Sequence, residues 1–167
     1  MEIIYRLAQT KDLDAIMNLM ENTVLAMADA SLYVADDRAT VLKHIKEEGN
    51  IVLAESGTLA GFLMVRYPGL AGDNLGRDIG FDEKALLKVA HMESTAVASD
   101  FRGQGIMSAL IRYGEALAQN RGCKYSMCTV SPDNPWSLSN MLARGYAIMA
   151  TVPKYGGVLR HILMRRL

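Results

Sequence analysis

The feature that most constrains the fold is a strand-like stretch that passes through a glycine-rich turn directly into a helical pattern. Residues 91–97 (HMESTAV) are predicted to form a strand, and residues 105–120 (GIMSALIRYGEALAQN) carry apolar side chains at helical spacing. The turn that joins them, residues 99–105, reads SDFRGQG. A strand, a turn and a helix in this order indicate a domain of the mixed α/β class.

The turn is suited to holding a diphosphate group. Gly103 and Gly105 let the backbone approach a ligand without a Cβ in the way, and the first N–H groups of a helix lack intrahelical partners. The helix dipole adds about half a positive charge at that end, and Arg102 adds a full one. The alternative is a tight turn whose glycines serve the backbone geometry alone.

Two common nucleotide motifs do not fit this turn. Residues 103–108 (GQGIMS) differ by one residue from the dinucleotide fingerprint G-x-G-x-x-G/A. That fingerprint needs an acidic residue about 20 positions later, where residues 121–128 (RGCKYSMC) are basic or neutral. No Lys-Ser or Lys-Thr pair follows, which excludes a Walker A loop. A nucleotide-bearing ligand that is recognised mainly through its diphosphate remains.

The rest of the chain predicts a mixed α/β sheet in a single domain that spans residues 1–167. No repeat, linker or low-complexity tract divides it. Further strands are expected at residues 2–7, 51–56, 59–67, 124–130, 147–152 and 158–165. Helices are expected at residues 13–20, 36–48, 82–89 and 137–144, and the glycine-rich residues 68–80 are expected to form a loop.

Composition and charge argue for small ligands. The chain has 18 basic and 18 acidic residues, so net charge does not support nucleic acid or an anionic membrane as the main partner. The first residues lack the apolar stretch of a signal peptide, and no apolar run approaches the ~20 residues of a membrane span. Cys123 and Cys128 would lie roughly 16 Å apart in a strand, too far for a disulfide. We expect a cytoplasmic protein without a metal site.

The turn and its flanking elements resemble motif A of the GNAT superfamily of N-acetyltransferases, usually written Q/R-x-x-G-x-G/A. Arg102 and Gly105 occupy the first two defined positions, and Met107 stands at the third, which normally holds glycine or alanine. The resemblance covers nearly the whole chain. Outside motif A it is carried by Arg6, Asp12, Leu13, Gly61 and Phe62, and by residues similar to motif B, namely Pro132, Asn134, Ser137, Asn140, Gly145 and Tyr146.

This resemblance implies a mostly antiparallel central sheet flanked by helices, with strands 91–97 and 124–130 splayed apart to form the acyl-CoA cleft. The Val97 amide would face the thioester carbonyl, where one donor is worth about 3 kcal/mol. Asn134 would bond the pantetheine arm, and an Asx-turn role is its alternative. Acetyl-CoA contacts are expected at Ala96, Val97, Arg102, Gly103, Gln104, Gly105, Ile106, Met107, Ser108, Asn134 and Ser137.

Transfer to an amine also requires a base that removes a proton from the incoming ammonium group. Strand alternation places His91, Glu93, Thr95 and Val97 on one face. Glu93 is the candidate base, with His91 behind it. The alternative for each is an ordinary pairing with an exposed neighbour.

The usual proton donor for the departing thiolate is missing from the sequence. Many GNAT enzymes carry a tyrosine four residues before the motif B glycine, and this chain has Met141 there. Tyr146, Ser137 and Ser139 are the candidate substitutes, with Tyr146 preferred. Solvent could also serve, because a thiol with a pKa near ~8.5 is a good leaving group.

The sequence therefore predicts an N-acetyltransferase that moves an acetyl group directly from acetyl-CoA to a primary amine of a small molecule or peptide. The alternative is a non-catalytic GNAT-fold module that binds or senses acyl-CoA. Acidic residues that would attract a cationic acceptor are Asp36, Asp37, Asp73, Asp78, Asp82 and Glu83. Exposed strand edges near the tail predict a homodimer.

Overall fold

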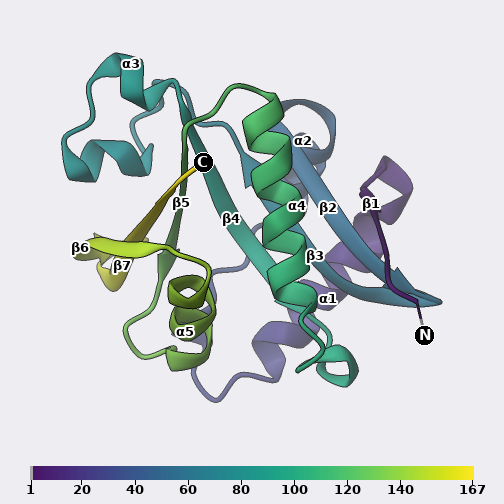
Figure 1. Cartoon of the computed structure of the whole chain (residues 1–167). Coiled ribbons are helices and arrows are strands. Elements are labelled where there is room, and N and C mark those ends of the chain that lie inside the picture. The colour runs from purple at the N-terminus through teal and green to yellow at the C-terminus, as the bar shows by residue number, and fades with distance from the viewer. Residues whose placement is uncertain (1) are drawn as a thin grey trace. The chain divides into compact units, whose positions relative to one another are not determined.

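The computed structural model describes residues 2–167 and contains a seven-stranded sheet flanked by helices (Figure 1). The strands are β1 (Ile4–Leu7), β2 (Gly49–Ser56), β3 (Thr58–Arg66), β4 (Val89–Val97), β5 (Tyr125–Val130), β6 (Ala147–Lys154) and β7 (Val158–Arg166), in the order β1-β2-β3-β4-β5-β7-β6. The α-helices are α1 (Leu13–Leu25), α2 (Arg38–Lys43), α3 (Glu83–Leu86), α4 (Ile106–Asn120) and α5 (Pro135–Ala143). The mixed, mostly antiparallel sheet confirms the predicted fold class.

The chain divides into two compact units. The first comprises Met1–Arg66 and Met92–Gly114, and the second comprises Tyr67–His91 and Glu115–Leu167. A single domain over residues 1–167 stays a prediction. The two units are described in turn.

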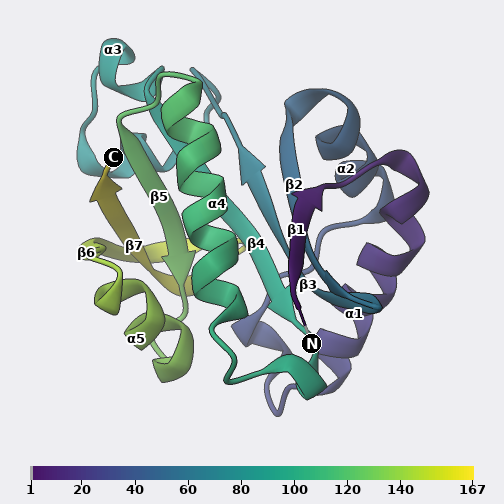
Figure 2. The same ribbon diagram turned by 45° about the vertical axis from the view of Figure 1, so that its right-hand side comes forward.

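In the first unit, helices cover both faces of β3. Ile16 and Met20 lie one turn apart on α1 and are buried in one core with Phe62. On α4, a Cβ added at Gly114 would lie 2.6 Å from Leu63 Cδ2. Phe62 and Leu63 are neighbours on β3 and so point to opposite faces. Figures 1 and 2 show α1 on one side of β2 and β3 and the start of α4 on the other.

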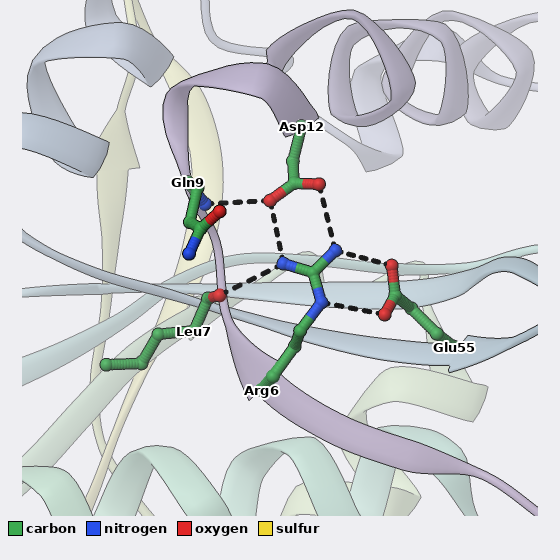
Figure 3. A network of polar contacts seen from close by, with 5 residues as sticks. All are labelled: Arg6, Leu7, Gln9, Asp12 and Glu55. Carbon is green, nitrogen blue, oxygen red and sulfur yellow. Dashed lines mark hydrogen bonds and ion pairs between the residues drawn. The ribbon is translucent and has the colours of Figure 1, made fainter.

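An arginine joins three segments of this unit (Figure 3). Arg6 on β1 makes two bonds to the Asp12 carboxylate, of 2.8 and 2.9 Å, and two to the Glu55 carboxylate on β2, of 2.7 and 2.6 Å. The Gln9 N–H also donates to Asp12 Oδ2 at 2.7 Å. The Arg6 guanidinium, the strongest influence, lowers the pKa of Asp12 from 3.8 to about 2.

In the second unit, β7 lies between β5 and β6 and pairs antiparallel with both. The start of β4 pairs parallel with β5 through Val89 with Tyr125, Ala90 with Ser126, and His91 with Met127. A small core forms here from Leu75, Val89, Met127 and Ile162. Cys123 and Cys128 are both buried and free, as their spacing predicted.

Two predicted helices differ from the observed ones. The helix expected at residues 36–48 begins at Arg38, because Asp37 Oδ1 accepts the Thr40 N–H at 2.7 Å and caps it. Its last turn, His44–Glu48, is a π-helical turn that leads into β2. The helix expected at residues 82–89 is only Glu83–Leu86, since Val89 is buried within β4.

Smaller differences occur elsewhere. The expected loop at residues 68–80 contains a 3₁₀ turn, Leu75–Ile79, which ends at Gly80 in the left-handed conformation with φ of 77°. Helix α5 begins two residues before the predicted start, at Pro135, because Asn134 is its N-cap. Within residues 2–167, no helix is both long and apolar enough to cross a membrane.

Candidate functional site

The turn between β4 and α4 requires glycine at two positions. Gly103 and Gly105 have φ of 74° and 75°, in the left-handed region that favours glycine. A Cβ added to either would meet nothing within 4 Å, so backbone conformation and not crowding selects these glycines. Residues 102–105 are exposed, and Ile106 is buried where α4 begins. The turn thus presents backbone to solvent at the N-terminus of a 15-residue helix.

Charged and polar groups of the same turn surround this helix start. Arg102 Nε donates to the Val97 carbonyl at 3.3 Å, and Gln104 Nε2 donates to the Asp100 carbonyl at 3.4 Å. The Ala109 N–H donates to Gly105 O at 3.0 Å, so helical bonding begins at Gly105. The positive end of the helix dipole and the Arg102 charge therefore lie together, an arrangement suited to an anion.

Glu93 on β4 belongs to a cluster of four charged or titratable residues, Asp36, His44, Arg66 and Glu93, which we call the Glu93 cluster. Glu93 Oε2 lies 3.3 Å from His44 Nε2, and Oε1 lies 3.5 Å from Arg66 Nη1. The Glu93 side chain is 28% exposed, so solvent and ligands can reach it. Burial raises the pKa of Asp36, and the nearby charge of Glu93 raises it further.

The next residue on β4 contacts the same segment of chain. Ser94 Oγ lies 2.5 Å from Tyr33 Oη, and burial raises the pKa of Tyr33 to about 12. Tyr33 and His44 both lie between α1 and β2. Strict alternation would send Glu93 and Ser94 to opposite faces. Tyr33 and His44 therefore contact neighbouring residues of β4.

His91, the second base candidate, is 4% exposed and serves a structural contact. Its Nε2 accepts the Leu75 N–H at 3.1 Å. That bond uses the lone pair that a base would need and fixes the proton on Nδ1. Through this bond, His91 holds the start of residues 75–79 against β4.

Tyr146, the candidate proton donor, lies in a buried polar network. Its hydroxyl donates to Glu115 Oε1 at 2.9 Å and lies 2.6 Å from Ser126 Oγ. Glu115 also accepts bonds from Arg144 Nη2 at 2.5 Å and from Arg165 Nη1 at 2.9 Å. Burial raises the pKa of Tyr146, which makes it a poor acid.

Two of the motif B residues, Asn134 and Ser137, lie at the start of α5. Asn134 Oδ1 accepts the Ser137 N–H at 3.1 Å, so its side-chain oxygen acts as the helix cap. Met141, which stands in the position of the usual tyrosine, is 2% exposed. Asn134 and Ser137 as ligand contacts stay a prediction.

Two residues that make charged contacts, Glu115 and His44, were missed from the sequence. Glu115 lies one turn after Ile111 on the apolar stripe of α4, and a charge on such a stripe is a signal of a buried ion pair. His44 gave no such signal, because its partner Glu93 is 49 residues away in the chain.

Comparison with known proteins decides the family. The model of the acetyltransferase (GNAT) family matches residues 17–146, which is most of the chain. The chain belongs to the GNAT acetyltransferase family. A search of curated protein sequences finds no match for this GNAT protein.

Solved structures resemble this GNAT protein over their full length. A GNAT acetyltransferase from Listeria monocytogenes is 19% identical with a TM-score of 0.76, covering 100% of this chain and 96% of the other. Ard1 from Thermoplasma volcanium is 16% identical with a TM-score of 0.74, and the match covers 100% of this chain and 99% of Ard1. The protein yncA from Salmonella typhimurium, solved with its cofactor acetyl-CoA, is 17% identical with a TM-score of 0.72, covering 100% and 95%. At these identities the likeness shows the fold.

Membership of this acetyltransferase family supports acyl transfer as the function of this chain. Within the described residues 2–167, no group of three or more His, Cys, Asp or Glu side chains is arranged to hold a metal ion.

Proposed function

We propose that this GNAT protein is an N-acetyltransferase that moves an acetyl group directly from acetyl-CoA to a primary amine of a small molecule or peptide. The observation that carries the proposal is the exposed turn at residues 102–105, with two left-handed glycines at the start of α4. Because a diphosphate needs several aligned N–H donors and a cation, this turn with Arg102 is suited to the CoA diphosphate.

In this proposal, the CoA contacts made by the first unit are the turn and the end of β4. Backbone groups of residues 102–108 would hold the diphosphate, and residues 96–97 would bond the pantetheine arm. The Val97 N–H would donate to the thioester carbonyl and stabilise the oxyanion that develops there, a contribution of about 3 kcal/mol. Arg102, bonded to the Val97 carbonyl at 3.3 Å, would keep these two parts of the site aligned.

Glu93 would act as the general base. Its side chain is partly exposed, and it lies among groups that hold its carboxylate in place. It would take a proton from the acceptor ammonium, so that the nitrogen lone pair can attack the thioester. Asp36, whose charge interacts with that of Glu93, would attract the cationic acceptor.

The departing thiolate would take its proton from solvent. Met141 cannot donate one, and Tyr146 is buried with its hydroxyl bonded to Glu115. A thiol has a pKa near ~8.5, so its anion leaves without an obligatory acid. His91, whose Nε2 already accepts a backbone bond, would position β4 and take no proton.

The test is a thiol-release screen with acetyl-CoA over polyamines, amino acids, aminoglycosides and peptide amino termini. We expect amine-dependent release by the unaltered protein and a loss of about 100-fold in kcat for Glu93→Gln, which removes the base and keeps the shape. Calorimetry should give the same acetyl-CoA affinity for both proteins.

A second candidate is a non-catalytic module that binds acyl-CoA, which the buried Met141 favours. Such a module would bind acetyl-CoA with no amine-dependent thiol release by the unaltered protein. If acetyl-CoA gives neither heat nor thermal protection, both candidates are wrong.

A further inference from the structure

His44 is a buried histidine whose two ring nitrogens both face acceptor oxygens. It is 2% exposed and begins the π-helical turn between α2 and β2. Its Nδ1 lies 3.2 Å from the Thr40 carbonyl oxygen, and its Nε2 lies 3.3 Å from Glu93 Oε2. Single π-helical turns occur often at functional sites.

These contacts fix where the protons lie. A carbonyl oxygen only accepts, so Nδ1 carries a hydrogen and donates it to Thr40. A carboxylate oxygen also only accepts, so a second proton must lie between Nε2 and Glu93 Oε2. His44 and Glu93 therefore share one proton in their contact.

The surrounding charges favour that proton on the histidine. Burial, the largest single influence, lowers the pKa of His44, but the contacts with Glu93 and the Thr40 carbonyl and the charge of Asp36 together raise it. This pair also faces Arg66, on Glu93 Oε1, and Glu48, whose carboxylate interacts with His44. These influences favour an imidazolium beside a carboxylate.

We propose that His44 is a positioning residue for acetyl transfer, whose protonated ring holds Glu93 ionised through Oε2. The other oxygen, Oε1, faces Arg66 Nη1 at 3.5 Å and, with its second lone pair, takes the proton of the acceptor amine. This inference rests on the proposed function, in which Glu93 is the base. A positively charged neighbour favours the ionised form of a carboxylate, so Glu93 stays ready to accept a proton at neutral pH. The contact with His44 also fixes the Glu93 side chain in one orientation.

The step balances without any further reactant. A proton moves from the acceptor ammonium to Glu93 Oε1, and the nitrogen lone pair forms a C–N bond to the thioester carbonyl carbon. The C–S bond then breaks with its electron pair on the CoA sulfur, which takes a proton from solvent. The His44 proton stays on Nε2 throughout.

The first test is an NMR titration of the ¹⁵N-labelled imidazoles, which needs no acceptor amine. In the unaltered protein, His44 should lose its Nε2 proton at higher pH than an ordinary histidine, whose pKa is about 6.5, and keep Nδ1 protonated above that. In Glu93→Gln, that pKa should fall by about one unit. His161, whose Nδ1 lies 2.8 Å from Thr151 Oγ1, is the internal control and should not change. An unchanged His44 titration in Glu93→Gln overturns the proposal.

The second test compares the pH dependence of kcat for the unaltered protein, His44→Gln and His161→Gln, with acetyl-CoA and the fastest amine of the screen. Glutamine can still donate to Glu93 but carries no charge. We expect the acidic limb of His44→Gln to move up by about one pH unit, so that kcat is about tenfold lower on that limb, with the KM for acetyl-CoA within about twofold. His161→Gln should match the unaltered protein.

The outcomes separate the two proposals. If Glu93→Gln releases thiol at the full rate, the base assigned under the proposed function is wrong. If Glu93→Gln is inactive but His44→Gln keeps the unaltered pH profile, only the role of His44 is wrong. Should His44→Gln fail to fold, the NMR titration of the unaltered protein and of Glu93→Gln still tests the role of His44.

Discussion

Two single residues, Gly103 and Gly105, give the turn before α4 its shape. Both have left-handed backbone conformations, and a Cβ added to either would meet nothing within 4 Å. The lack of a side chain therefore permits the positive φ and lets a ligand approach the backbone. The motif in the sequence predicted this position, because strand, glycine turn and helix follow one another without a gap. The Arg102 bond to the Val97 carbonyl could not be predicted, since it depends on the path of the turn.

Gly105→Ala tests the turn. The left-handed conformation costs a residue with a Cβ about 1 kcal/mol, and the added methyl would project where the diphosphate is proposed to lie. We expect the Kd for acetyl-CoA to rise about tenfold, measured by calorimetry. Gly72→Ala is the matched control, because Gly72 also has open space but no left-handed φ. An unchanged Kd in Gly105→Ala would remove the turn from the cofactor site.

Asp36→Asn tests whether the acceptor is drawn by charge. Removing one carboxylate near Glu93 should raise the KM for the amine about fivefold, with a smaller change in kcat, and the effect should shrink at high salt. Asp37→Asn removes the same charge one residue away, while asparagine still caps α2. Steady-state thiol release measures both. If both variants raise the KM for the amine equally, the net negative charge of this segment attracts the acceptor and Asp36 has no specific role.

At the scale of elements, the Arg6 contacts hold the first two strands and the start of α1 together. Because two carboxylates engage one guanidinium in paired bonds, the geometry is stronger than that of an ordinary surface pair (Figure 3). The folded state lowers the pKa of Asp12, so the stabilisation is complete above the unfolded pKa of 3.8 and is lost as pH falls through about 2.

Asp12→Asn should therefore lower the free energy of unfolding by about 1 to 2 kcal/mol at pH 7. Its stability should also fall less than that of the unaltered protein between pH 5 and pH 2. Urea unfolding at several pH values measures both effects. Asp14→Asn is the control, since Asp14 is 77% exposed and pairs with the exposed Arg38. Parallel pH curves for Asp12→Asn and the unaltered protein would contradict this.

Local patterns predicted most of the elements, and errors arose where tertiary contacts decide. The strands β2 and β3 follow from two apolar stretches on either side of Gly57 and were predicted from them. Helical spacing continued the third predicted helix to Val89, yet burial and pairing with Tyr125 place that residue in β4. The Glu93 cluster needed the fold, because residues 36, 44, 66 and 93 come from four different segments.

At the scale of the whole molecule, β6 is an outer strand of the sheet and exposes apolar side chains. Ile148 and Met149 on β6 are 42% and 44% exposed, and Leu159 on β7 is 50% exposed. An outer strand has unpaired backbone groups that can join another chain. These features support the homodimer proposed from the sequence.

Sedimentation should give a mass twice the 18.3 kDa of one chain. Ile148→Lys should shift the equilibrium to the monomer, because a buried lysine at an interface of two copies costs several kcal/mol. Leu87→Lys is the control, as Leu87 is 58% exposed and lies at the end of α3. A monomeric mass for the unaltered protein would end the proposal.

The two buried thiols have a practical consequence for enzymology. Burial raises the pKa of Cys128 to about 12 and also raises that of Cys123. Since only the thiolate attacks a disulfide reagent, neither side chain should react in the native protein over the minutes of an assay. The colour developed by such a reagent then counts liberated coenzyme alone, and a sudden rise of two equivalents per chain reports that the protein has unfolded.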